Sequence, residues 1–286
     1  MTRTTRDLIL AFMLTGASLW LCLSIGGGAP VKAPAGIPDP GQLVGWALPF
    51  VKVLTDLSAV MVIGFLVAAV FLLPSSGDEV EGLSVQAVRI ASRWAMVWST
   101  ASVALFFLTV SDILAEPLPG LSWAQVSSFV QVQSLGRAIL LQALLAAFVA
   151  VAVRWTLGVR ALAGVLGVSL AALAPIALTG HAASSGSHDL ATTSLVLHLV
   201  GVTLWVGGLT ALGWVAIRGS KRLEPAITRF STLAIWAFVI VGASGVVNAA
   251  VRLGSFDQVF GSWYGRLVLA KVAALAVLGT LGYFQR

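Results

Sequence analysis

Three histidines, His181, His188 and His198, lie close together in one stretch of this chain. The first two flank a short Ser/Gly loop, and the third lies inside the apolar run that follows. Imidazole nitrogens are ligands for copper, zinc, iron and nickel. The stretch therefore predicts a metal site, in which His181 and His198 share one ion and His188 stands at its mouth. The alternatives are an ordinary interhelical hydrogen bond for His198 and a solvated loop position for His188.

Other polar side chains fall inside long apolar segments, where an ionisable group is costly and is a candidate functional residue. The candidates for an ion pathway or for contacts to metal ligands are Lys52, Asp56, Asp112, Arg137, Trp205, Asn248 and Lys271. At about 1.5 Å rise per helical residue, all the ionisable ones lie in the outer half of the predicted spans. This asymmetry predicts a polar cavity that opens to the outside, with His198 at its floor.

Structural explanations compete with this prediction. Lys52 and Asp56 are four residues apart on one helical face and can neutralise each other. Lys271 can pair with Asp56 or with Asp112. Trp205 follows His198 by seven residues and can simply pack against a neighbouring helix.

The composition requires elements that span a membrane. The 286 residues are 58% hydrophobic and 10% charged, with a mean hydropathy of +0.98. Each span needs about 20 apolar residues, and in lipid only helices and closed barrels satisfy their own backbone. The apolar runs are continuous rather than alternating, which excludes a barrel. The sequence predicts an all-α polytopic bundle in a single membrane domain over residues 1–286.

About eight transmembrane helices are expected. Their predicted ranges are 8–25, 46–73, 91–115, 136–153, 161–179, 190–217, 230–250 and 263–284. Lys and Arg are concentrated in loops 74–89, 154–160 and 218–229, which places these loops and both termini in the cytoplasm. The same pattern explains the pI of about 10.2 without a nucleic-acid partner. Cys22 is the only cysteine, so an intrachain disulfide and a CxxC metal site are excluded.

The C-terminal third of the chain resembles the bacterial CopD family of copper-resistance and copper-uptake membrane proteins. Its segments RFSTLAIWAFVIVGASGVVNAAVRLGS and WYGRLVLAKVAALAVLGTLGYFQR follow the family pattern of a Phe-Ser start, an "SG…NA" segment and "YGR…L..K". The preceding HLVGVTLWVGGL resembles the family's "H…G…WVGG" helix. The matching residues are His198, Gly201, Trp205, Gly207, Gly208, Phe230, Ser231, Ser244, Gly245, Asn248, Tyr264, Gly265, Arg266 and Lys271. The signature region therefore covers residues 190–286.

The resemblance implies copper movement across the bacterial plasma membrane, or copper supply to an oxidase, and it leaves the direction open. Because the predicted cavity opens to the outside, we expect a copper-binding permease that imports a copper ion. The resemblance also implies partners besides the lipid bilayer: an extracytoplasmic copper carrier, or a domain like the oxidase assembly factor CtaG. We expect no enzyme activity, because the chain has no nucleophile motif and no HExxH.

Two alternatives stay open at this point. The first is an assembly or copper-supply factor for a respiratory oxidase. The second is a b-type haem electron carrier with His181 and His198 as axial ligands.

Overall fold

The computed structural model describes residues 3–34, 36–73, 77–179, 188–219, 221–253 and 255–284, and for residues 3–12, 188, 189 and 283 it describes only the backbone. This part of the chain is helical, with an isolated bridge between Glu79 and Gly158 as its only β pairing, which confirms the all-α prediction. The helices are α1 (Arg3–Ile25), α2 (Gln42–Val67) continued by the π-helix η1 (Ala68–Leu72), α3 (Leu83–Leu114), the 3-10 turn η2 (Leu118–Gly120), α4 (Trp123–Val132), α5 (Ser134–Trp155), α6 (Val159–Ala171), α7 (Ala174–Ala177), α8 (His188–Ile217), α9 (Leu223–Arg252), α10 (Asp257–Gly261) and α11 (Trp263–Phe284).

Within the described residues, seven helices are long and apolar enough to cross a membrane. They are Gln42–Leu72, Leu83–Leu114, Ser134–Trp155, Val159–Ala177, Leu190–Ile217, Leu223–Arg252 and Trp263–Gly282. The remaining predicted span is α1, which is apolar over Met13–Ile25 in the part searched. The chain is therefore a multi-pass membrane protein.

Three local predictions were wrong. Residues 116–135, expected to be a loop, contain α4, whose N-terminus is closed by a reciprocal capping box between Ser122 and Gln125. The predicted loop 251–262 contains the short α10. The predicted helix 161–179 is broken, and α6 ends four residues before Pro175 because a proline cannot donate a helix hydrogen bond.

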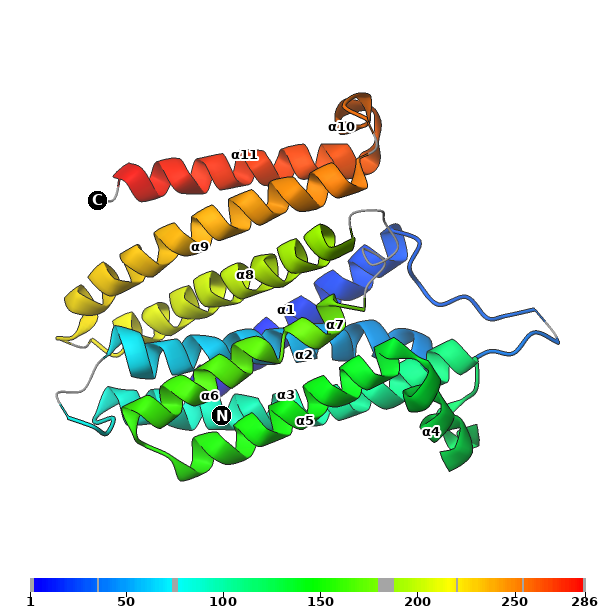
Figure 1. Cartoon of the computed structure of the whole chain (residues 1–286), viewed down its shortest axis with the longest axis horizontal. Coiled ribbons are helices and arrows are strands. Elements are labelled where there is room, and N and C mark those ends of the chain that lie inside the picture. Colours follow the sequence, from blue (N-terminus) through cyan, green and yellow to red (C-terminus); the bar gives the residue numbers. More distant parts are fainter. Residues whose placement is uncertain are drawn as a thin grey trace. The chain divides into compact units, whose positions relative to one another are not determined.

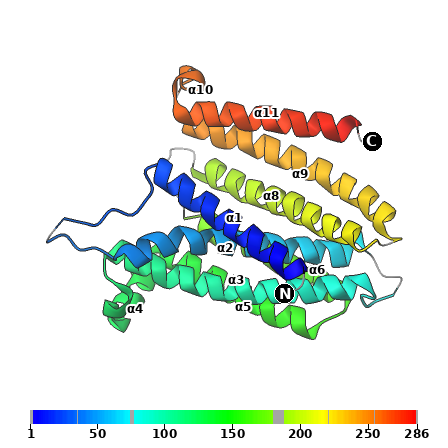
Figure 2. The same ribbon diagram turned by 180° about the vertical axis from the view of Figure 1, so that it is seen from behind.

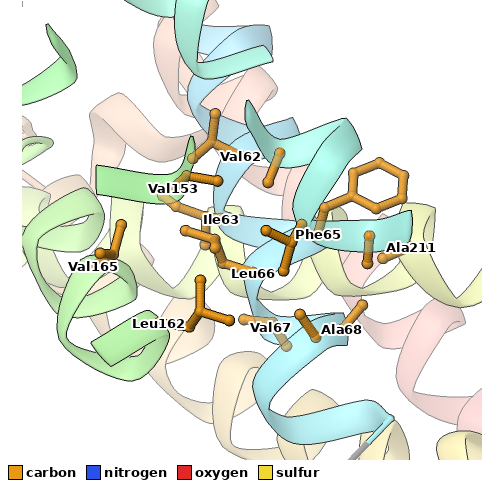
Figure 3. Packing of buried hydrophobic residues seen from close by; sticks show 14 of the residues in the cluster. Val62, Ile63, Phe65, Leu66, Val67, Ala68, Val153, Leu162, Val165 and Ala211 are labelled. Carbon is orange, nitrogen blue, oxygen red and sulfur yellow. The ribbon is translucent and has the colours of Figure 1, made fainter. Parts of the chain in front are cut away.

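The chain divides into two compact units. Unit 1 comprises Met1–Leu57 and Thr100–Leu140, and unit 2 comprises Ser58–Ser99 and Leu141–Arg286. The core of unit 2 is formed where α2, α5, α6 and α8 meet, with Ile63, Leu66, Val153, Leu162 and Ala211 among its members. Figure 3 shows how these side chains interdigitate. In lipid, such close packing stabilises helix association through dispersion contacts.

The helices α8, α9 and α11 of unit 2 lie side by side, in that order, in both views (Figures 1 and 2). In the described part of the chain, α8 and α9 pack extensively against each other. α11 is the least covered of the seven spans, with 6% of its apolar window buried inside the chain. Most of α11 is therefore free to contact lipid.

Hydrogen bonds join the basic loops at one end of unit 2. Arg218 Nη1 donates to Gln86 Oε1 at 3.2 Å, which links the end of α8 to the start of α3. Arg229 Nη1 donates to Phe71 O at 3.4 Å, which satisfies a carbonyl in the last turn of η1. The amide of Val80 donates to Leu157 O at 2.9 Å and ties the 74–82 segment to the α5–α6 turn. The three loops predicted to be cytoplasmic thus share one end, as the alternation of spans requires.

In unit 1, Asp39 organises the loop between α1 and α2. Its Oδ2 accepts from Ala33 N at 2.8 Å, and its Oδ1 accepts from Gly41 N at 2.7 Å. These two backbone hydrogen bonds lower the pKa of Asp39 below its usual value. Asp39 also lines a groove of about 320 Å³ together with Asp112 and prolines of the same loop.

The order of this loop is expected to depend on Asp39 being ionised. A lowered folded-state pKa means that the stabilisation is present at neutral pH and is lost as the pH falls through that pKa. Hydrogen-exchange mass spectrometry of the peptide containing Ala33 and Gly41 should show faster exchange in Asp39→Ala than in wild type at pH 7. The difference should disappear on strong acidification. An equal exchange rate at pH 7 would show that the carboxylate does not hold the loop.

Candidate functional site

His198 lies on α8, eight residues after the membrane span begins at Leu190, and its side chain is half-buried. At about 1.5 Å per residue this is a depth of about 12 Å. Its Nδ1 lies 3.1 Å from Ser244 Oγ of α9. Among the described residues, Ser244 is the only side chain that hydrogen-bonds the ring, and no side chain bonds its Nε2. The sequence prediction of an interhelical hydrogen bond is confirmed, and it leaves one ring nitrogen for a ligand.

Ser194 and Ser244 connect α8 and α9 beside this imidazole. Ser194 Oγ donates to the backbone carbonyl of Ser244 at 2.9 Å, and both side chains are buried. Ser194 stands one helical turn before His198, so the two residues reach the same residue of α9 from one face of α8. Ser194 was not among the predicted site residues, although this four-residue spacing from His198 was visible in the sequence.

Small residues allow α8 and α9 to approach closely enough for these bonds. A Cβ on Gly201 would lie 2.9 Å from Cγ2 of Val241, so any larger residue would push the two helices apart. One turn further on, Trp205 packs edge-to-face against Phe238 of α9, with ring centroids 5.8 Å apart. The structure thus shows a packing contact for Trp205, and its place in an ion path stays a prediction.

Two other predicted residues belong to the same unit. Asn248 lies one turn after Ser244 on α9 and is half-buried, and Lys271 lies on α11, which packs on α9. The Lys271 ammonium is near enough for its charge to act on His198. His198, Asn248 and Lys271 therefore come from three neighbouring helices. A cationic Lys271 opposes a metal cation at His198 unless an anionic group accompanies the metal.

The remaining predicted membrane residues belong to unit 1. Lys52 and Asp56 lie one turn apart on α2, and the Lys52 charge acts on Asp56. Asp112 is exposed near the end of α3 and lines the loop groove. That these side chains share one cavity with the residues of unit 2 stays a prediction.

Arg137, at the start of α5, has a structural contact. Its Nη1 donates to Gln131 O at 2.8 Å and to Val130 O at 3.4 Å. These are carbonyls in the last turn of α4, which a helix leaves without internal partners. Arg137 therefore caps α4, and its predicted part in an ion pathway has no support of its own in the geometry.

The structure does not describe the side chains of two of the three predicted metal ligands. His181 lies outside the described residues, and for His188 the structure gives only its backbone, at the start of α8. Among the described residues, no group of three or more His, Cys, Asp or Glu side chains is arranged to hold a metal ion. Of the three predicted metal ligands, His198 is thus the one whose side chain the structure describes.

Comparison with known proteins identifies the family. The family model described as "Copper resistance protein D-like, N-terminal domain" matches residues 42–190, just over half of the chain. The model described as "Copper resistance protein D" matches residues 224–286. The chain belongs to the CopD family. This confirms the family resemblance seen in the sequence and extends it to residues 42–190, while residues 191–223, which include His198, lie between the two matches.

Two curated proteins are similar to this CopD-family chain. The copper transport protein CutJ of Bacillus subtilis (strain 168) is 30% identical over 113 residues, which cover 37% of this chain and 20% of CutJ. The inner membrane protein YebZ of Escherichia coli (strain K12) is 31% identical over 98 residues, which cover 33% of each chain. The chain thus spans a third or less of the length of these relatives. No solved structure matches it.

Proposed function

We propose that this CopD-family protein is a copper permease that imports copper, and that Nε2 of His198 is a copper ligand along the path. One observation carries the proposal: an intramembrane imidazole whose Nδ1 is anchored to Ser244 of a neighbouring helix while no described side chain hydrogen-bonds its Nε2. Ligating histidines typically use their second ring nitrogen in this way, to fix the ring orientation. The similarity to CutJ, which is named a copper transport protein, supports copper as the transported ion.

The other predicted residues have distinct proposed roles. His181 and His188 would receive copper at the outer mouth, from an extracytoplasmic copper carrier or from solution. Asp56 and Asp112 are our candidates for carboxylates that offset the positive charge of the ion along its path. Carboxylates at such depth also relay protons in transporters, so the same groups are our candidates for coupling.

Copper accumulation in intact cells tests the proposal. Cells that lack their own copper-uptake proteins should gain cell-associated copper when they express the wild-type protein. The His198→Ala variant should lose most of this gain, because the path loses a ligand inside the membrane. Membrane abundance of each variant must be measured in parallel.

Thr203→Ala is the matched control for this experiment. The Thr203 side chain is buried on the same helix, and among the described residues its hydroxyl donates to the Leu199 and Val200 carbonyls of that helix. Removing it changes a buried polar group of α8 without touching His198. Equal accumulation by His198→Ala and Thr203→Ala would refute the role of His198. Lower cell copper on expression of the wild-type protein would instead indicate export.

A further inference from the structure

Ser244 is the only described side chain that hydrogen-bonds the imidazole of His198, and its own hydrogen-bonding geometry decides which ring nitrogen carries the proton. Its Oγ lies 2.5 Å from the Ile240 carbonyl, 3.2 Å from the Val241 carbonyl and 3.1 Å from His198 Nδ1. A serine hydroxyl has one proton to donate and two lone pairs that accept. Three neighbours therefore compete for a single hydroxyl proton.

The Ile240 carbonyl must receive that proton. A carbonyl oxygen has no hydrogen of its own, so an oxygen–oxygen approach of 2.5 Å without a proton between them would be repulsive. Once Ser244 Oγ donates to Ile240 O, it can only accept from the histidine. His198 must then carry its proton on Nδ1 and donate it to Ser244 Oγ.

The second ring nitrogen follows from this assignment. A neutral imidazole has one N–H and one lone pair, so an Nδ1–H ring presents a lone pair at Nε2. A doubly protonated ring has no lone pair on either nitrogen, so only the neutral ring can bind a metal. The neutral Nδ1–H form is thus the state in which His198 is ready to bind a metal.

The backbone that carries Ser244 is also held in place. Ser194 Oγ donates to Ser244 O at 2.9 Å, so the residue that anchors the imidazole is itself tied to the helix of the imidazole. Gly245, the next residue, leaves room for the ring: a Cβ there would be in ordinary contact with His198 Cε1, at 4.0 Å. The two serines and the histidine form a closed set of contacts between α8 and α9.

We infer that Ser244 is a positioning residue, which holds His198 in the Nδ1–H tautomer and so presents the Nε2 lone pair to copper. The inference rests on the proposed function for its copper part. The tautomer assignment itself needs no metal. For zinc and similar sites, loss of such an outer hydrogen-bond partner costs about 10- to 100-fold in metal affinity.

The test is ¹⁵N NMR of the metal-free, full-length protein, labelled at histidine. Because the chain has three histidines, a His181→Gln/His188→Gln variant leaves the His198 signals alone. We expect a protonated, pyrrole-type Nδ1 and an unprotonated, pyridine-type Nε2. In Ser244→Ala the Nδ1–H population should fall, and copper affinity should drop by about 10- to 100-fold. Ser244→Thr keeps the hydroxyl and should restore both, whereas Thr203→Ala should change neither.

The outcomes separate this inference from the proposed function. A protonated Nε2 in the wild-type protein would overturn the inference without any variant having to fold, even if copper binds. An unchanged tautomer together with an unchanged copper affinity in Ser244→Ala would also overturn it. A wild-type protein that has the expected tautomer but binds no copper would refute the proposed function and the copper part of the inference, and would leave Ser244 as the residue that sets the tautomer.

Discussion

Replacing Gly207 with alanine is expected to lower the melting temperature of the purified protein by roughly 2–12 °C. A Cβ at Gly207 would lie 2.5 Å from the Val60 carbonyl and 2.9 Å from Gly64 Cα. Both contacts are to backbone, which has no rotamer to change, so α2 and α8 must move apart. Overpacking of this kind costs about 1–3 kcal/mol, and each kcal/mol lowers the melting temperature by about 2–4 °C in larger domains.

Gly213→Ala is the matched control. It lies on the same helix, and a Cβ there would meet no atom within 4 Å. Alanine is favoured over glycine in a helix by about 1 kcal/mol, so this variant should melt at or above the wild-type temperature. Gly64→Ala should resemble Gly207→Ala, because its Cβ would overlap the Gly207 carbonyl. In the double variant the losses should not add, since one alanine has already separated the helices. Equal melting of Gly207→Ala and Gly213→Ala would show that α2 and α8 do not touch at this point.

The spans and their alternation were predictable because they follow from strong physical constraints. A run of about 20 apolar residues can satisfy its backbone in lipid only as a helix. Arg218 and Arg229, read as cytoplasmic from the positive-inside pattern, do meet Gln86 and Phe71 at one end of unit 2. The predicted start of α9 was too late: the helix begins at Leu223, so Arg229 belongs to its second turn rather than to the preceding loop.

Shorter elements escaped prediction for a different reason. α4 has ten residues, too few to register as a span, and it follows two prolines that favoured a loop. Its Ser122–Gln125 capping box was nevertheless readable in the sequence. The π-helical end of α2 at Ala68–Leu72 has no comparable signal, because its residues are also good α-helix formers in lipid. We have no physical account of why the backbone widens there.

The sequence predicted how deep in the membrane the candidate site residues lie, but not which way their side chains point around the helix axis. Sequence position gives the distance of His198 or Asn248 from the end of a span, since each residue adds about 1.5 Å. It does not give the direction of a side chain around the helix axis, which packing decides. This is why the pairing of His198 with Ser244, and the contact of Arg137 with the last turn of α4, became visible only in the structure. For Trp205, the packing alternative is the contact that the structure shows.

The largest functional effect is expected for His198→Ala. If Nε2 of His198 is a copper ligand, the wild-type protein purified after copper loading should carry near-stoichiometric copper, and the variant should carry at least about 100-fold less at the same free copper concentration. Removing only a hydrogen-bond partner of a metal ligand lowers metal affinity by up to about 100-fold. Because His198→Ala removes the ligand itself, we take this value as the lower limit of the expected loss. Copper content by mass spectrometry of the metal, per protein, is the measurement. A Soret band in the same preparations would instead favour the haem alternative.

The three histidines also provide an internal comparison. His181→Ala tests whether the loop histidine shares the ion, and it should reduce copper content if it does. His188→Ala, at the start of α8, should have the smallest effect on copper content. A residue at the entrance of the cavity raises the local copper concentration but does not coordinate the ion inside the membrane. A variant series in which His188→Ala loses the copper and His198→Ala keeps it would place the site outside the membrane. Equal and full copper in all three would mean that the ion is held elsewhere, and copurification with a respiratory oxidase would then favour the assembly role.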